Sequence, residues 1–267
     1  MFFLLWKRIN AVIAGFLKFF YYFCTRKKQT GKKMVSGIET DMRQTAQSMT
    51  ELWTPLTDSQ RELLVKSIRV KRYEKHEIIY HENALPTDLY CLLRGKVKIY
   101  KMGVGGRKQI VRMVSSKGFF GYRAGFAGGA YLTEGSAIEP TTLCCIPLDV
   151  IKDIIRNNHQ VAIYFIRQLA SLLGAADAHT VSLTQKHLRG RLAEALLQLK
   201  NSYGTEDDRS TLAVSISRED LANLSNMTTS NAIRTLSAFV ADGLIATDGR
   251  RISIQDEPEL RRISQLG

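Results

Sequence analysis

The chain has 267 residues, of which 45% are hydrophobic and 24% are charged, and it contains only five prolines. This composition is typical of a globular protein and excludes collagen-like, proline-rich and disordered chains, and the length allows two domains. The formal net charge is +13, of which residues 1–48 contribute +7. The charge on the rest of the chain permits a polyanionic partner without identifying one.

Residues 2–24 are rich in Phe, Leu and Ile and precede a basic run at residues 26–33. On a helical wheel this segment has one broad apolar face and a second face that carries Lys7, Arg8 and Lys18. The charges leave its apolar run too short to span a bilayer, whereas an aromatic amphipathic helix with a basic flank is typical of segments that lie on an anionic membrane. One prediction is therefore membrane contact through residues 2–24.

A second interpretation is that residues 1–48 do not belong to the native protein. Residues 25–48 are polar and show no convincing periodicity, and Met34, Met42 and Met49 each offer a later translation start. The sequence leaves both interpretations open.

The middle of the chain has the pattern of a β-rich domain. Residues 57–67 predict a short helix, after which the hydrophobic period changes to that of strands. Glycines and Pro86 separate short runs rich in Val, Ile and Tyr, which is typical of a sandwich, jelly roll or barrel. The predicted strands are residues 69–73, 77–81, 89–93, 97–101, 109–113 and 142–147.

Two motifs in this region resemble a known domain. Residues 89–100 read LYCLLRGKVKIY, which alternates, turns at Gly95 and alternates again, and residues 118–121 read GFFG. With these motifs, residues 50–150 resemble the cyclic-nucleotide-binding-type β-roll. The resemblance implies a sensor domain in which a carboxylate after a glycine binds the ribose and an arginine before a serine neutralises the cyclic phosphate.

The chain departs from that pattern at both positions. It has Tyr122 in place of the carboxylate and Gly135 in place of the arginine. Because a buried phosphate needs a compensating cation, we do not expect ordinary cAMP binding. Arg123 could replace the missing cation if it points inward; otherwise it faces solvent or a neighbouring domain. The candidate effector pocket comprises Gly121, Tyr122, Arg123 and Ser136, and its effector is unidentified.

The four cysteines, Cys24, Cys91, Cys144 and Cys145, do not predict a cofactor site. They lack the clustering of iron–sulfur ligands, and the sequence shows no haem or zinc signature. They also do not resemble a disulfide framework, so we expect a reducing, cytoplasmic compartment and core positions for the cysteines of the predicted strands.

Residues 148–157 predict a short helix and residues 159–183 a long one that contains a single glycine. The long helix carries a seam with spacings of 4, 3, 4, 3 and 4, which is formed by Phe165, Leu169, Leu172, Ala176, His179 and Leu183. Such a seam is typical of a helix that pairs with a second copy of itself. The alternative is that the same face packs against the β-roll of its own chain.

Residues 217–254 have the pattern of a helix-turn-helix followed by a wing. Ser217 predicts an N-cap, with Asp220 as a short relative of the glutamate of a capping box, and Asn226 in the turn can adopt a left-handed conformation. A second helix follows over residues 228–242, with Ile233 and Val240 among the residues expected to face inward. The Asp-Gly pair at residues 248–249 then predicts a β-hairpin.

This order of elements is that of domains that place a recognition helix in the major groove of DNA. Hydroxyls near the helix start can approach phosphates, amides and hydroxyls read base edges, and arginine can bind guanine. The predicted DNA-binding residues are Ser217, Arg218, Thr228, Thr229, Ser230, Asn231, Arg234 and Arg250.

The β-roll, the long helix, the lead-in KHLRGRLA at residues 186–193 and the winged helix-turn-helix together resemble the Crp/Fnr family of transcription regulators over residues 50–255. Family recognition helices often carry an Arg-Glu pair where this chain has Thr229 and Ser230, whereas Arg234 matches the family's later arginine. The resemblance implies palindromic double-stranded DNA and a second copy of the chain as partners, with RNA polymerase as a further candidate.

The predicted fold class is α+β, with a jelly-roll-like N-terminal β-roll sensor domain, a long dimerisation helix and a C-terminal winged helix-turn-helix domain. The expected divisions are an extension at 1–48, the sensor domain at 49–157, the dimerisation helix at 158–184 and the DNA-binding domain at 185–257. The predicted function is that of a homodimeric, sequence-specific regulator and not of an enzyme. The alternative is a membrane-associated sensor whose winged helix makes protein contacts.

Overall fold

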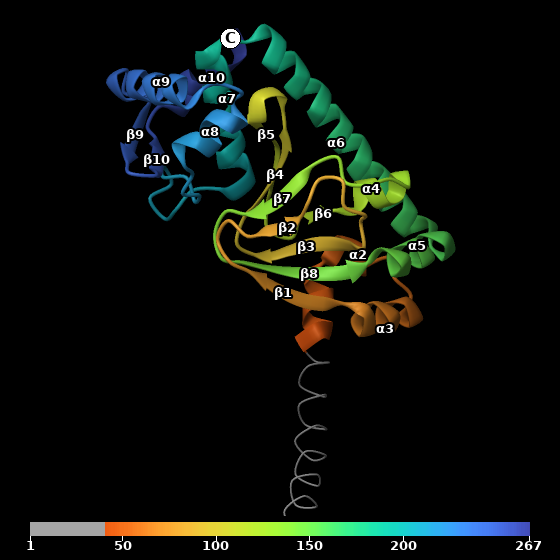
Figure 1. Cartoon of the computed structure of the whole chain (residues 1–267). Coiled ribbons are helices and arrows are strands. Elements are labelled where there is room, and N and C mark those ends of the chain that lie inside the picture. The colour runs from red at the N-terminus through yellow and green to blue at the C-terminus, as the bar shows by residue number, and fades with distance from the viewer. Residues whose placement is uncertain (1–40) are drawn as a thin grey trace, which may run out of the picture.

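The computed structural model describes residues 41–267, so the predicted amphipathic helix at residues 2–24 lies outside the described residues. A β-roll and a small helical domain lie at the two ends of a long helix, α6 (His159–Gln185). The small domain folds back toward the β-roll, and the hairpin of β4 and β5 reaches up to it (Figure 1). This arrangement matches the predicted fold class.

The β-roll consists of two four-stranded antiparallel sheets. The first has the order β1 (Arg69–Tyr73), β8 (Thr141–Pro147), β3 (Asp88–Arg94) and β6 (Phe119–Phe120). The second has the order β2 (Ile78–Tyr80), β7 (Glu134–Ala137), β4 (Val97–Met102) and β5 (Lys108–Val114). The six predicted strands are confirmed, whereas β6 and β7 are too short or too glycine-rich to give a periodic signal.

The two sheets separate three apolar cores because side chains alternate along each strand. In β3, Tyr90 and Leu92 point between the sheets, while Leu89 and Cys91 point to the helices that cover the first sheet. The outer face of the second sheet contributes Tyr100 and other residues to a core that it shares with the C-terminal domain. The β-roll therefore packs against helices on one side and against the C-terminal domain on the other.

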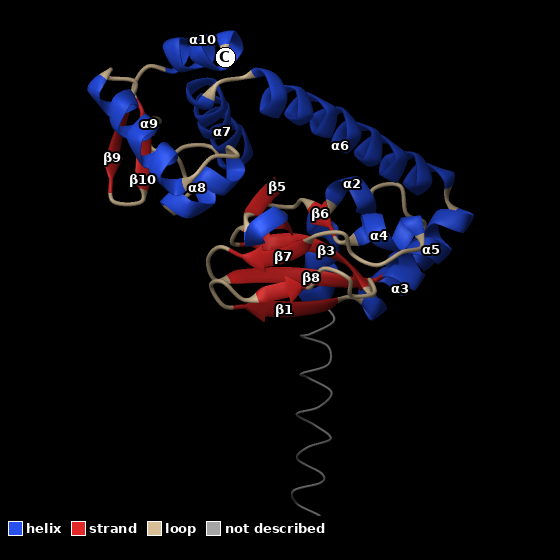
Figure 2. Ribbon diagram, turned by 45° about the horizontal axis from the view of Figure 1, so that its top comes forward, coloured by secondary structure: helices blue, strands red, loops and turns tan. Residues whose placement is uncertain are grey.

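Four short helices and a helical stretch at residues 41–48 pack on the first sheet (Figure 2). The short helices are α2 (Thr50–Trp53), α3 (Asp58–Ser67), α4 (Tyr122–Ala127) and α5 (Leu148–Asn157). In α3, Thr57 and Gln60 form a capping box. Ala46 and Met49 are buried, so the folded domain includes the helical stretch at 41–48, which the polar composition of residues 25–48 did not indicate.

The long helix α6 exposes a different apolar stripe from the predicted seam. Phe165 is buried in the β-roll core, Leu169 packs against that core, and His179 and Leu183 lie half-buried near α7. The exposed apolar residues are Ile163, Ile166, Leu173 and Val181. Phe165 and Leu169 therefore pack against the β-roll of their own chain, as the alternative interpretation held, whereas His179 and Leu183 lie against α7 and Ala176 is exposed. Among the described residues, α6 is long and apolar enough to cross a membrane by length and composition, and 11% of its most apolar stretch is buried.

The C-terminal domain contains α7 (Leu188–Tyr203), α8 (Arg218–Leu224), α9 (Thr229–Ala241), β9 (Ile245–Asp248), β10 (Arg251–Ile254) and α10 (Glu257–Leu266). The predicted winged helix-turn-helix is thus present, and α10 extends the domain beyond residue 257. Helix α10 crosses α7 closely at Gly190, where an added Cβ would come within 2.6 Å of the backbone of Gly267.

Candidate DNA-binding site

Side-chain caps fix the start of both helices of the helix-turn-helix. Ser217 Oγ accepts a hydrogen bond from the Asp220 amide at 2.9 Å, and Thr228 Oγ1 accepts one from the Asn231 amide at 3.2 Å. Between them Asn226 has a φ of 49°, the left-handed conformation predicted for the turn. The two caps satisfy amides that a helix start otherwise leaves free.

Helix α9 presents a polar face to solvent. Thr228, Thr229, Ser230 and Arg234 are exposed and Asn231 is half-buried. Arg234 Nη2 donates a hydrogen bond to Asn231 Oδ1 at 2.6 Å. The structure therefore brings these five predicted residues together at the start of one helix, where their hydroxyl, amide and guanidinium groups can reach phosphates and base edges.

The inward positions predicted for α9 are partly wrong. Ala232, Leu236 and Phe239 are buried as expected, but Ile233 is 46% exposed and Val240 is 42% exposed. Each exposed residue directly follows a buried one, and adjacent residues of a helix point about 100° apart, so Ala232 and Phe239 face the core while Ile233 and Val240 turn toward solvent. Ile233 instead joins the exposed face, one turn along from Ser230.

The first helix is tied to the wing by Arg218. Its Nη2 donates a hydrogen bond to the carbonyl oxygen of Gly249 at 2.9 Å, and burial lowers the pKa of its guanidinium. Arg250, at the tip of the wing, is exposed. Arg251 forms an ion pair with Glu206. Arg218 thus positions the wing, whereas Arg250 remains accessible to a phosphate.

Sequence reasoning missed Arg189, which holds the far end of α9. Its Nη2 lies 2.8 Å from Asp242 Oδ2, and its guanidinium lies 4.8 Å from the centre of the Phe239 ring. The sequence gives no sign of this contact, because Arg189 lies in the first turn of α7 and its partner Asp242 follows 53 residues later.

In the β-roll, aromatic rings fill the space between the sheets. The rings of Tyr80 and Tyr131 stack with centres 4.0 Å apart, and those of Tyr90 and Phe120 lie 5.2 Å apart. A Cβ added to Gly135 would come within 2.6 Å of the Tyr80 ring. The position that carries the phosphate-binding arginine in cyclic-nucleotide-binding relatives is therefore next to a tyrosine ring in this chain.

The predicted effector residues do not converge on one cavity. Gly121 approaches the Tyr90 ring, and Arg123 is exposed at the start of α4. Tyr122 is buried beside Phe126 and Phe165, outside the space between the sheets. Ser136 pairs directly with Lys98. Directly opposed residues of antiparallel strands share a face, and Lys98 points to the C-terminal domain, so Ser136 also points away from the interior.

The cation that does face the interior is Arg112, which the sequence analysis did not single out. It lies opposite Ile99, whose side chain points between the sheets. Its Nη2 donates to the carbonyl oxygen of Phe119 at 3.0 Å, and desolvation lowers its pKa. A β-bulge between Ile99 and Tyr100 breaks the alternation, so the inward position of Arg112 cannot be read from the sequence.

The cysteines occupy the core positions that were predicted. Cys91, Cys144 and Cys145 are free and buried, and burial raises the pKa of the Cys91 thiol to about 12 and that of Cys145 to about 11. Within residues 41–267 there is no group of three or more His, Cys, Asp and Glu residues that could hold a metal ion.

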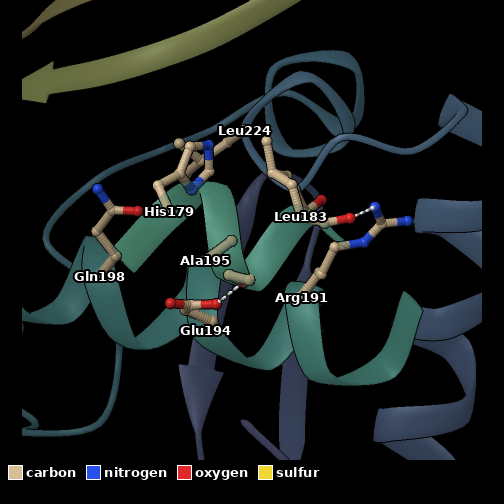
Figure 3. A pocket seen from close by; sticks show the side chains of 9 residues that line it. His179, Leu183, Arg191, Glu194, Ala195, Gln198 and Leu224 are labelled. Atoms are coloured by element: carbon tan, nitrogen blue, oxygen red, sulfur yellow. Dashed lines mark hydrogen bonds between the residues drawn. The ribbon is translucent and has the colours of Figure 1, made fainter. Parts of the chain in front are cut away.

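A recess with a cavity volume of about 10 Å³, room for about one water molecule, lies where α6, α7 and α8 meet (Figure 3). His179 and Leu183 of α6 face Glu194 and Arg191 of α7, and Arg191 donates to the Leu183 carbonyl oxygen. Small-molecule sites occupy roughly 300–1,000 Å³. The recess is therefore a gap in the helix junction that is too small for an ordinary effector.

Comparison with known proteins supports both halves of this architecture. Residues 70–158 match the family model of the cyclic nucleotide-binding domain, and residues 190–263 match that of the Crp-like helix-turn-helix domain. The chain belongs to the Crp/Fnr family. Crp/Fnr relatives are transcription regulators and not enzymes, in agreement with the sequence analysis.

Individual Crp/Fnr relatives are distant from this chain in sequence, but each match covers most of the relative's length. The transcriptional regulator LdrP of Thermus thermophilus is 27% identical over 193 residues, which are 72% of this chain and 95% of the relative. The CRP-like cAMP-activated global transcriptional regulator of Mycobacterium tuberculosis is 22% identical over 200 residues, 74% of this chain and 89% of the relative. The structure of FixK2 from Bradyrhizobium japonicum matches with a TM-score of 0.68 at 24% identity, covering 73% of this chain and 96% of FixK2.

Proposed function

We propose that this Crp/Fnr protein is a cytoplasmic homodimer that binds a two-fold-related DNA site in a sequence-specific manner. The observation that carries the proposal is the exposed face of α9, on which Thr229, Ser230 and Arg234 lie side by side. The capped helix starts lie on one side of this face, and the exposed Arg250 of the wing lies on the other. Ser217, Arg218, Thr228 and Asn231 complete the proposed interface.

The dimer is proposed on the exposed apolar stripe of α6. Ile166 is 58% exposed and Leu173 is 64% exposed on a helix whose middle has few contacts to its own chain. Exposed apolar residues that line one side of a helix in this way are typical of a surface that a partner covers in soluble proteins. Pairing α6 with its twin would relate two copies of α9 by a two-fold axis, with half-sites about one helical turn apart.

The effector is proposed to act on the β-roll, and ordinary cAMP is not our candidate. Tyr122 stands where a carboxylate would bind the ribose, and Tyr80 lies beside Gly135. The sequence predicts Gly121, Tyr122, Arg123 and Ser136 as one effector pocket, but because they do not converge on one cavity we do not propose a pocket formed by all four. RNA polymerase stays a candidate partner. A membrane-associated sensor that makes only protein contacts is not favoured, because the relatives are transcription regulators.

The test is retardation of genomic DNA fragments by the purified full chain across a salt series. Binding through phosphates releases counterions, so affinity should fall steeply as salt rises. Binding of some fragments at nanomolar to micromolar protein, with this salt dependence, supports the proposal. Failure to bind any fragment, also in the presence of small-molecule cell extract, contradicts it.

A further inference from the structure

Strand β4 has one face in the interior of the β-roll and the other against the C-terminal domain. Val97 and Ile99 belong to the core between the two sheets, together with the tyrosine rings. Lys98 and Tyr100 point the opposite way, and Tyr100 shares a core with residues of the winged helix-turn-helix. A displacement of β4 caused from within the β-roll therefore also moves side chains that contact the other domain.

An ion pair connects the two domains at this strand. Lys98 Nζ lies 2.5 Å from Asp220 Oδ1 of α8, although the two residues are 122 positions apart. Their side chains are only 11% and 8% exposed. A charge that is buried without a partner is costly, so each residue depends on the other for its position.

The carboxylate of Asp220 is available to Lys98 because of the way α8 begins. The amide of Asp220 is bonded to Ser217 Oγ, while its side chain points to β4 instead of back to the cap. Helix α8 then contacts α9 through residues such as Leu221 and Leu224 in the shared core. The position of α8 on β4 thus determines where the recognition helix stands relative to the β-roll.

Other contacts surround the ion pair and limit its freedom. Ile110 and Met113 of β5 lie in the same core as α8, and Tyr203 Oη donates to the carbonyl oxygen of Val114 at 3.1 Å. Lys96 Nζ lies 5.8 Å from the centre of the Tyr203 ring. The interface is therefore a packed surface with a single buried charge pair at its centre on β4, within the described part of the chain.

We propose that Lys98 and Asp220 are positioning residues that fix the winged helix-turn-helix on the β-roll and pass displacements of β4 to the recognition helix. This inference rests on the proposed function, since it concerns how DNA binding is regulated. Two recognition helices must keep a fixed separation to occupy both halves of a symmetric site, whereas one helix on one half-site needs no such constraint.

The experiment uses the full chain with Lys98→Met, Asp220→Asn, the conservative Lys98→Arg and the charge-exchanged double variant Lys98→Asp with Asp220→Lys. Lys101→Met is the matched control, because Lys101 lies on the same strand but forms its ion pair with Glu82 of the β-roll. Affinity is measured by fluorescence anisotropy for a symmetric duplex selected by the wild-type protein from random DNA, and for a duplex with one half-site. Hydrogen–deuterium exchange of residues 97–102 and 218–224 is followed without DNA.

The two single variants that break the pair should bind the symmetric duplex about tenfold more weakly, a change of roughly 1.4 kcal/mol, and the half-site within about twofold of wild type. They should also exchange faster in both segments, while Lys98→Arg, the charge-exchanged variant and Lys101→Met stay near wild type. Equal loss on both duplexes, or no change in exchange, overturns the inference. If the wild-type protein binds no DNA, the proposed function fails, whereas the exchange measurements still decide whether the pair holds the domains together.

Discussion

Arg234 donates a hydrogen bond to Asn231 Oδ1 at 2.6 Å, one turn earlier on the exposed face of α9. The contact holds the arginine along the helix surface before DNA is present, which reduces the side-chain entropy lost on binding. It also orients the amide of Asn231, so the two residues form one polar unit at the recognition face.

Replacing Arg234 with Ala should relax base preference at one position of each half-site. An arginine that binds guanine with two hydrogen bonds contributes about 1–3 kcal/mol of discrimination. The measurement is a binding series on duplexes with every single-base substitution. The comparison variant is Arg250→Ala, which we expect to weaken all duplexes alike and to reduce the salt dependence. If Arg234→Ala also lowers the affinity for all duplexes equally, Arg234 contacts a phosphate and not a base.

Ile233 should contact the methyl group of a thymine, because it is 46% exposed on α9 next to the polar residues of the recognition face. Replacing the contacted thymine with uracil removes one methyl group, which is worth about 0.8 kcal/mol when buried. The wild-type protein should therefore distinguish the two duplexes, and Ile233→Ala should not. Val240→Ala, at an exposed apolar position two turns later, is the control. If both variants distinguish the duplexes equally, Ile233 does not face DNA.

Leu173→Glu should convert the dimer to a monomer, because it places a charge in the apolar stripe of α6. Sedimentation of the variant and of wild type measures the change. Leu85→Glu is the control, since Leu85 is 77% exposed on the β-roll and lies outside the stripe. A variant at position 173 that sediments as wild type would place the dimer contact elsewhere.

Millimolar cAMP should leave the thermal midpoint Tm of the protein unchanged. A ligand present at 100 times its Kd stabilises a folded protein by about 2.7 kcal/mol, which is several degrees in Tm. We expect no such shift because Gly135 offers no cation and the ring of Tyr80 lies beside it. A saturable rise in Tm with cAMP would show that the interior rearranges to admit the nucleotide.

The stability of the protein should depend on pH through His179. Burial lowers the pKa of His179 below its ordinary value of 6.5, and Glu194 opposes this in part. The unfolded chain then binds more protons than the folded chain, so the free energy of unfolding contributed by this residue falls as pH drops through the unfolded pKa. Urea unfolding at about pH 7.5 and about pH 5.5, on either side of that value, should show a smaller loss for His179→Gln than for wild type.

His159→Gln is the matched control for this measurement, because His159 is exposed at the start of the same helix. If the free energy of unfolding depends on pH in the same way for wild type and His179→Gln, the junction of α6 and α7 does not restrict protonation of His179. That junction contains His179 Nε2, which is buried and lacks a hydrogen-bond partner among the described residues.

Local features of the site could be predicted from the sequence, whereas features that depend on distant partners could not. The caps at Ser217 and Thr228 accept hydrogen bonds from amides three residues later, and Asn226 needs only its own backbone conformation. Capping and turn preferences therefore locate these residues in the sequence. The spacing of Phe165 and Leu169 correctly indicates a helix but does not say which surface covers it. The sequence also places Asp220 in a helix start without revealing its partner Lys98, which lies 122 residues earlier.

The central claim is that two copies of the winged helix-turn-helix bind duplex DNA about a two-fold axis, and selection of bound sequences from a random DNA pool tests it most directly. We predict that the recovered sequences share an inverted repeat whose halves are centred about 34–36 Å apart, one helical turn. Recovery of sequences without any shared symmetric element would contradict the account.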